Sequence, residues 1–345
     1  PGAFTGLETL RSLDICSNGL AGLRTGAFEG LEGLWYLSLT SCIIQPVHVT
    51  SMLLGVTRSS LSSISSGAFH GLGSLQALDL RYNNLTSIAP GTFDGLGSLQ
   101  ELYLYGNGLT HIPPGAWEGV GNLTTLSFCC GPPRSNRIAG MEMSFTQPAF
   151  GLFCPSTPMS LPYQFEQFSN QFNFSLISWN GLGSLQTLDL KENVGLTNIS
   201  AGSFHGLGNV TVLDLRRNGL TSIPAGAFEG LVNLEKLEIW SSKLTSISPG
   251  AWDGLGTLET LRMDCGTFSS LGRQVHFSSC GATPYKLNLS AVPWEGLSSL
   301  QTLELCYSNL PSIPAQAFTG LRSLETLYVS SCTVGEITPG AFTGL

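Results

Sequence analysis

Residues 75–98 read LQALDLRYNNLTSIAPGTFDGLGS, and residues 99–122 read LQELYLYGNGLTHIPPGAWEGVGN. Aligned without a gap, the two segments share an L-x-x-L-x-L start, an asparagine at the ninth position and an aromatic-x-Gly near the end. Self-similarity at a fixed period is typical of repeat proteins, so the sequence predicts a solenoid. Copies of this 24-residue unit begin at Leu10, Leu34, Leu75, Leu99, Leu123, Leu185, Val210, Leu234, Leu258, Leu300 and Leu324.

Each position of the unit has a structural interpretation. The alternation of leucine with variable residues predicts a short strand with one buried face. Because equivalent strands of successive units lie side by side, we expect one parallel sheet. The ninth-position asparagine, as in Asn83 or Asn107, is expected to satisfy backbone groups where the chain leaves the strand. The aromatic, as in Phe93 or Trp117, is expected to pack against its counterparts in neighbouring coils.

The unit resembles the 24-residue leucine-rich repeat of extracellular proteins, and the chain is similar to the ectodomains of Toll-like receptors and Slit proteins. This resemblance implies a leucine-rich repeat solenoid of the α/β horseshoe class, mostly β. It implies a curved parallel sheet on the concave face and irregular or short 3-10 segments on the convex face. It says little about the ligand, since one fold hosts many functions. The family's cysteine-rich caps are absent, so residues 1–345 are expected to be one solenoid within a longer array.

Three units are longer than 24 residues. The excess follows the strand in each case, near residues 43–60, 131–170 and 267–288. Long loops on a rigid scaffold often carry binding residues. The longest is rich in aromatic residues, which makes it too apolar for a free linker. It either packs on the solenoid or contacts a partner.

The cysteines and glycosylation sequons favour an extracellular or cell-surface glycoprotein, secreted or part of a receptor. The six Asn-x-Ser/Thr sequons begin at Asn84, Asn122, Asn173, Asn198, Asn209 and Asn288. Two cysteine pairs share one register, from the seventh position of a unit to the ninth of the next, and two others would close parts of the insertions. The candidate disulfides are Cys16 with Cys42, Cys130 with Cys154, Cys265 with Cys280, and Cys306 with Cys332. Cys129 has no predicted partner.

Charge and motifs exclude several classes of function. The chain has 15 Lys and Arg against 23 Asp and Glu, and its cations are scattered. We therefore expect no nucleic-acid partner and no membrane contact. Catalytic motifs and metal-ligand spacings are absent, so no enzyme activity, cofactor or metal is predicted. Acidic residues such as Asp79 and Asp214 precede a basic residue by two positions, here Arg81 and Arg216, which we interpret as charge pairing on the sheet.

Binding is expected on the concave face, at variable positions that carry aromatic and basic residues. The candidates are Trp35, Tyr36, Tyr82, Tyr103, Tyr105, Lys191, Arg216, Arg217 and Trp240. Tyr, Trp and Arg often anchor interfaces, although variable solvent-facing positions also acquire them by chance. The sequence thus predicts an extracellular recognition module that presents this face and three edge loops to a protein or glycan. The alternative is a structural glycoprotein subunit of an extracellular fibre, wall or appendage that binds copies of itself.

Overall fold

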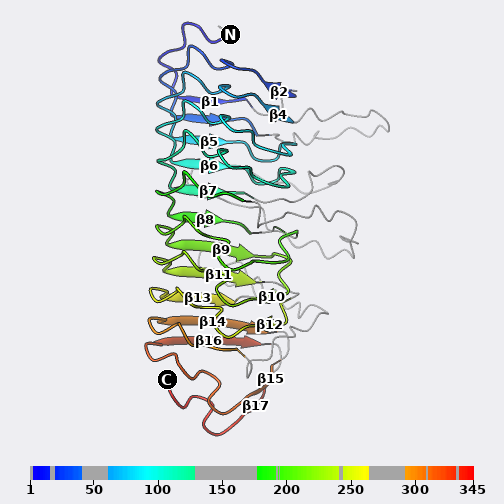
Figure 1. The fold of residues 1–345 in the computed structure, drawn as a ribbon, viewed down its shortest axis with the longest axis vertical. Helices are drawn as coiled ribbons and strands as arrows, with labels where there is room; N and C mark the ends of the chain where they lie inside the picture. Colours follow the sequence, from blue (N-terminus) through cyan, green and yellow to red (C-terminus); the bar gives the residue numbers. More distant parts are fainter. Residues whose placement is uncertain are drawn as a thin grey trace, which may run out of the picture.

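The computed structural model describes residues 3–15, 20–40, 61–128, 177–191, 193, 195–240, 244–263, 292–307, 310–331 and 334–345. Coils stack along one axis, and each contributes a strand to an 11-stranded parallel sheet whose order follows the sequence (Figure 1). The predicted leucine-rich repeat architecture is confirmed. The strands are β1 (Ser12–Asp14), β3 (Tyr36–Ser38), β5 (Ala77–Asp79), β6 (Glu101–Tyr103), β7 (Thr125–Ser127), β8 (Thr187–Asp189), β9 (Val212–Arg216), β11 (Lys236–Trp240), β13 (Thr260–Met263), β14 (Thr302–Tyr307) and β16 (Thr326–Ser331).

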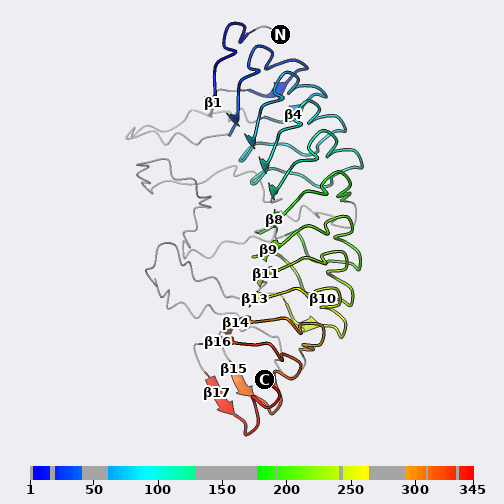
Figure 2. The ribbon, with the colours of Figure 1, turned by 90° about the vertical axis from the view of Figure 1, so that its left-hand side faces the viewer.

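The stack of coils is curved, with the 11-stranded sheet on the inner side of the arc and turns on the outer side (Figure 2). Three small two-stranded parallel sheets lie away from the main sheet. They pair β2 (Gly22–Leu23) with β4 (Ser63–Ile64), β10 (Ser222–Ile223) with β12 (Ser246–Ile247), and β15 (Leu310–Ile313) with β17 (Val334–Ile337).

Of the two forms expected for the outer side, irregular chain or short 3-10 segments, the described residues show the irregular one, as turns. The glycine of each aromatic-x-Gly sequence contributes to this. Gly119, for example, has a φ of 91°, and a Cβ atom at this position would lie 2.5 Å from the carbonyl oxygen of Phe93. A left-handed residue in close contact with the preceding coil interrupts any helical run. The described part of the chain contains no helix with the length and apolarity that a bilayer span requires.

The three expected insertions fall in residues 41–60, 129–176 and 264–291, outside the described residues. The strands on either side of each gap are described, and they pair directly with one another. Their registers match leucine to leucine, as elsewhere in the sheet. The matched residues are Leu37 with Leu78, Leu126 with Leu188, and Leu261 with Leu303. Of the cysteines predicted to form disulfides, only Cys306 has a described backbone, in β14, and the others lie outside the described residues.

The core consists of the repeat leucines and a column of aromatic rings. Leu75, Leu78 and Leu80 are completely buried. Consecutive rings stack, with centroid distances of 5.9 Å for Phe28 and Phe69 and 6.2 Å for Phe93 and Trp117. The four tryptophans of the column also donate their indole N–H to a carbonyl of the following coil at 2.6–2.8 Å. The column therefore joins successive coils by both packing and hydrogen bonds.

A ladder of buried asparagines holds the strand ends together. The Nδ2 atom of Asn107 donates to the carbonyls of Leu80, in the preceding coil, and Leu104, at 2.9 and 2.8 Å. Its Oδ1 atom accepts from the amide of Leu85 at 3.1 Å. Asn83, Asn193 and Asn218 occupy the same position and are buried in the same way. The predicted role of the ninth-position asparagine is thus confirmed.

We expect Asn107→Ala to lower the free energy of unfolding by about 2–4 kcal/mol, because the buried amide of Leu85 and the buried carbonyl of Leu104 lose their partner, whereas the carbonyl of Leu80 still accepts from Asn83. The comparison is Asn84→Ala, which removes an asparagine side chain that makes no hydrogen bond with the described residues and should cost less than about 1 kcal/mol. Both are measured by urea unfolding of protein produced in bacteria, which lacks N-glycans. Equal losses in the two variants would contradict the role assigned to Asn107.

Candidate binding surface

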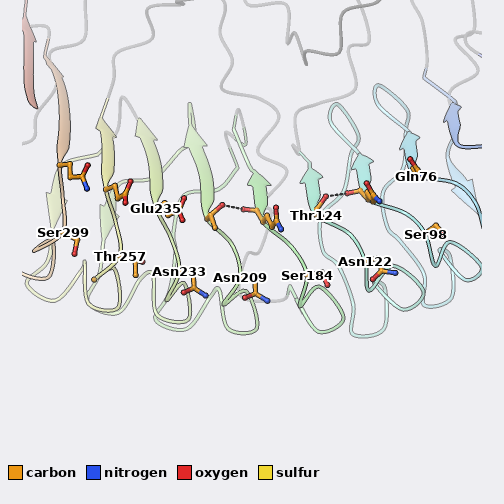
Figure 3. Close-up of a pocket in the computed structure, with 16 residues that line it drawn as sticks. Gln76, Ser98, Asn122, Thr124, Ser184, Asn209, Asn233, Glu235, Thr257 and Ser299 are labelled. Carbon is orange, nitrogen blue, oxygen red and sulfur yellow. Dashed lines mark hydrogen bonds between the residues drawn. The ribbon is translucent and has the colours of Figure 1, made fainter.

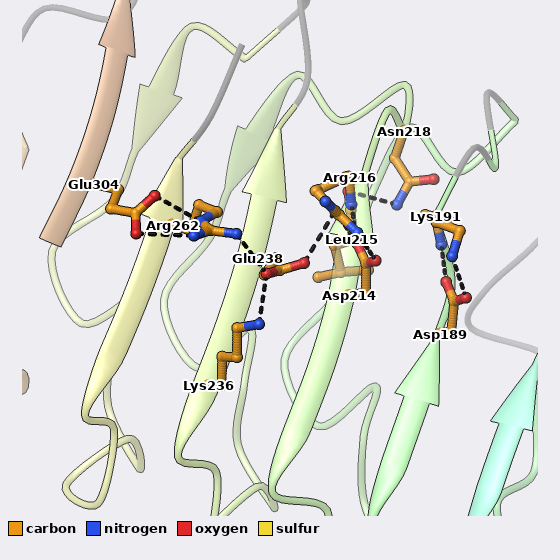
Figure 4. Close-up of polar contacts among 10 residues, drawn as sticks. All are labelled: Asp189, Lys191, Asp214, Leu215, Arg216, Asn218, Lys236, Glu238, Arg262 and Glu304. Atoms are coloured by element: carbon orange, nitrogen blue, oxygen red, sulfur yellow. Dashed lines mark hydrogen bonds and ion pairs between the residues drawn. The ribbon is translucent and has the colours of Figure 1, made fainter. Parts of the chain in front are cut away.

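The inner face of the sheet carries the side chains of the third, fifth and seventh positions of each unit. Paired charges occupy one half of it. Arg216, at the end of β9, contacts Asp214 in its own strand at 2.6 Å and Glu238 in β11 at 3.0 Å. Glu238 is also paired with Lys236 at 2.8 Å and with Arg262 in β13 at 3.3 Å (Figure 4).

The same pattern extends to both sides of these strands. Arg262 pairs with Glu304 in β14 at 2.7 Å, and Lys191 pairs with Asp189 at the end of β8 at 2.7 Å. Between β8 and β14 the network joins four carboxylates to four cations. The carboxylates belong to Asp189, Asp214, Glu238 and Glu304, and the cations to Lys191, Arg216, Lys236 and Arg262.

This network confirms the charge pairing that the sequence suggested, and burial adds a further point. Asp79, Asp214 and Glu238 expose only 2%, 8% and 5% of their surface, although they lie on the inner face. The basic side chains cover them and neutralise them. A nearly neutral network of this kind exerts little attraction on a charged partner.

Asp189 lies at one end of the network and is electrostatically constrained. Burial raises the pKa of its carboxyl group, the Lys191 ammonium opposes this rise, and the charge of Asp214 adds to it. The hydroxyl of Ser127 also donates to Asp189, at 3.2 Å. The ionised form of Asp189 therefore depends on Lys191.

Tyrosines occupy the other half of the inner face. We define the aromatic patch as Tyr36, Tyr82, Tyr103 and Tyr105, which lie on or beside β3, β5 and β6. Tyr82 and Tyr105 contact each other edge to face, with ring centroids 5.4 Å apart. The Arg81 guanidinium lies over the Tyr103 ring at 5.5 Å from its centroid.

The patch differs in exposure from one residue to the next. Tyr103 exposes only 8% of its surface and donates its hydroxyl to Glu101 at 2.6 Å, so it supports the patch from below. Tyr36, Tyr82 and Tyr105 are half-buried. Burial raises the pKa of Tyr36, and burial together with the Glu101 hydrogen bond raises that of Tyr103. Both hydroxyls therefore stay protonated at neutral pH.

Two of the predicted binding residues have a left-handed backbone. Tyr82 and Arg217, both at the eighth position of their units, have φ angles of 59° and 57°. The next unit has Gly106 there, with a φ of 75°. A residue other than glycine in this region costs roughly 1 kcal/mol. Such exceptions often mark functional positions.

The predicted binding residues do not form one patch. Four of them make up the aromatic patch, whereas Lys191 and Arg216 belong to the charge network. Trp35 precedes β3 and lies at the edge where the strands begin, 6.0 Å from Tyr36 between ring centroids. The backbone of Trp240 pairs with that of Arg216, and its side chain lies outside the described residues. The predicted residues therefore fall into separate groups according to the strand and the position that each occupies. Residue type alone does not reveal this division.

The dependence of Asp189 on Lys191 gives a pH-dependent prediction. The pKa of the Asp189 carboxyl group is higher in the folded protein than in the unfolded chain, so its protonated form favours folding. This contribution to the free energy of unfolding is complete below the pKa of the unfolded chain, about 3.9, and is lost as the pH rises through the pKa of the folded protein. Lys191→Met raises that pKa further, so we expect it to destabilise the protein by about 1–3 kcal/mol at about pH 7. The deficit relative to wild type should shrink as the pH falls towards about 4, because protonation removes the buried charge.

The matched control is Lys236→Met, because Glu238 keeps Arg216 and Arg262 as partners. Its loss should be smaller and should change little with pH. Thermal unfolding of wild type and both variants across this pH range measures the difference. A deficit of Lys191→Met that is constant across the range would contradict the assignment.

Comparison with known proteins agrees with this architecture. Human Toll-like receptor 3 is 32% identical to this chain over 92 residues, and the bovine protein is 33% identical over 92 residues. Each alignment covers 24% of this chain and only 10% of the receptor.

Two solved structures are also similar, with low identity. The human trophoblast glycoprotein, Wnt-activated inhibitory factor 1, is 21% identical, with a TM-score of 0.48 over 74% of this chain and 77% of that one. A TLR13–ssRNA13 complex is 18% identical, with a TM-score of 0.33 over 96% of this chain and 61% of that one.

The family comparison covers most of the sequence. The family described as Leucine rich repeat matches residues 1–44, 52–109, 83–128, 176–220, 208–264 and 287–345. These matches include the strands of the main sheet, so family and fold agree. The chain belongs to the leucine-rich repeat family.

Proposed function

We propose that this chain is a recognition module that binds a protein partner through the aromatic patch. The observation that carries the proposal is the division of the inner face. The charges between β8 and β14 are paired with one another. The tyrosines beside β3, β5 and β6 instead offer aromatic surface, of which Tyr36, Tyr82 and Tyr105 are half-buried.

The chemistry of the patch suits a protein partner. Tyrosine supplies a large contact area with few rotatable bonds, so little entropy is lost when it is fixed at an interface. Arg81 is held by Asp79 at 2.5 Å and lies over Tyr103, which makes the patch rigid before any partner binds. Preorganisation of this kind lowers the cost of association.

The backbone of Tyr82 adds an independent argument. Glycine would relieve the left-handed conformation at this position, as Gly106 does in the next coil. A tyrosine is nevertheless present, and its ring contacts Tyr105. We interpret the retained strain as the cost of placing an aromatic side chain at the rim of the patch.

We further propose an extracellular or cell-surface setting, in which N-glycans and disulfides form. The sequons support it, because Asn122, Asn198 and Asn209 are exposed and accessible to glycosylation, and Asn84 is half-buried. Asn173 and Asn288 lie outside the described residues. The proposed module binds without catalysing a reaction, as is common for repeat scaffolds that present an extended surface.

The variant Tyr82→Gly tests the proposal, because it removes the side chain and also relieves the backbone. We expect the free energy of unfolding to change by less than about 1 kcal/mol. Binding to partners from an array of secreted and cell-surface proteins should weaken at least tenfold, the size of effect typical of anchor residues. Surface plasmon resonance and urea unfolding give the two readouts.

Gln316→Gly is the matched control. Gln316 has a φ of 56° and lies outside the 11-stranded sheet, so the substitution makes the same backbone change away from the patch. Equal binding by wild type and Tyr82→Gly would argue against the aromatic patch. Electron microscopy addresses the alternative function: ordered polymers of the purified protein would favour a structural subunit, and single solenoids would contradict it.

A further inference from the structure

An open polar groove of about 1260 Å³ runs along the edge of the main sheet where the strands begin (Figure 3). Two rows of side chains line it. The first, which we call the second-position row, immediately precedes the strands. It includes Gln76, Gln100, Thr124, Gln186, Thr211, Glu235, Glu259 and Gln301. The sequence analysis did not single out these residues, although glutamine and threonine recur there from unit to unit.

The second row occupies the last position of the units and contains serine, threonine and three asparagines. The Nδ2 atoms of the asparagines donate to a glycine carbonyl of the preceding coil at 2.7, 2.7 and 2.8 Å for Asn122, Asn209 and Asn233. No described residue donates to their Oδ1 atoms. These oxygens are thus held in fixed positions along the groove as available acceptors.

The second-position row has unused hydrogen-bonding capacity. The side-chain amides of Gln76, Gln100 and Gln186 are exposed and make no hydrogen bond with the described residues. Glu235 and Glu259 are the only charged residues among the described residues that line the groove. A lining without cations disfavours nucleic acids and acidic polysaccharides, whose binding requires clustered Lys and Arg.

The spacing of the row indicates a ligand that is itself a repeating chain. The strands pair in register, so polar groups at this position recur at about 4.8 Å across the sheet, as amides and hydroxyls except for the carboxylates of Glu235 and Glu259. The lined edge extends from β5 to β14 and is therefore roughly 30 Å long. Peptides that bind along sheets usually insert alternate side chains into pockets. The predominantly polar lining here suits a chain with hydroxyl groups on every monomer.

An aromatic residue lies next to one end of the groove. Trp35 occupies the second position of its unit, and its carbonyl accepts a hydrogen bond from the amide of Gln76 at 2.9 Å. The half-buried indole can offer an apolar face to the C–H face of a sugar ring. A stacking platform beside a row of amides combines the two interactions that a neutral sugar can make.

We propose that this groove binds a neutral linear glycan. The side chains of the second-position row would form hydrogen bonds with the sugar hydroxyl groups, and the indole of Trp35 would stack against a sugar ring. The proposal concerns a surface separate from the aromatic patch. Two sources could supply the chain. One is a free polysaccharide, and the other is a linear arm of an N-glycan of this protein itself, since the sequon asparagines Asn122 and Asn209 line the groove.

The test uses the full chain produced without N-glycans and titrated with neutral hexasaccharides of glucose, mannose and N-acetylglucosamine. Calorimetry should detect binding of at least one of them at about millimolar affinity or better. Replacing Gln100 and Gln186 together with alanine removes two hydrogen-bonding groups and should weaken this binding about tenfold. Trp35→Ala should weaken it to a similar extent.

Two controls identify the surface. Thr125→Ala with Thr187→Ala changes third-position residues outside the groove lining and should leave the affinity unchanged. Tyr82→Gly should also leave the affinity for the hexasaccharide unchanged. The glycan test is therefore independent of whether the aromatic patch binds a protein. Absence of binding by all the hexasaccharides, or equal affinity of wild type and the double glutamine variant, would overturn the proposal.

A second preparation carrying N-glycans distinguishes the two sources. If the attached chains fill the groove, the hexasaccharide that binds the bare protein should not bind the glycosylated one, and enzymatic removal of the N-glycans should restore binding. If the ligand is a free polysaccharide, both preparations should bind it. Either result supports the groove as a glycan site.

Discussion

Burial between successive coils is the interaction on which the rest of this protein depends. A single 24-residue unit is too small to bury its leucines and its aromatic residue. The leucines are fully buried only because the next coil covers them, and each ring of the aromatic column needs a neighbour at about 6 Å. Stability is therefore a property of the contact between coils.

Buried polar groups also depend on the neighbouring coils, which supply their hydrogen-bond partners. The buried asparagines satisfy the carbonyls of their own coil and of the preceding one, and the column tryptophans donate to the following coil. Each unit thus completes the hydrogen bonding of its neighbours. This requirement keeps the strands in register. As a result, equivalent variable positions of successive units line up as a row across the sheet.

The rows explain why one scaffold can present different surfaces. On the inner face, acidic and basic residues two positions apart form a network that neutralises itself across β8 to β14. Beside β3, β5 and β6, this face also carries tyrosines, at the third, fifth, seventh and eighth positions of their units. At the edge where the strands begin, the row consists of amides and hydroxyls with two carboxylates, those of Glu235 and Glu259. The chemistry of each surface depends on which row and which coils it includes.

Local sequence pattern was sufficient to predict the solenoid, the parallel sheet, the buried asparagines and the aromatic column, because each depends on residues that recur at a fixed period within the unit. Only the tertiary structure showed that the carboxylates of Asp79 and Glu238 are buried beneath cations and that Tyr82 is left-handed. It also revealed the groove, whose two rows belong to different positions of the repeat. The physical reason is that these features arise between coils, where contacts depend on register and curvature rather than on the order of residues within one unit.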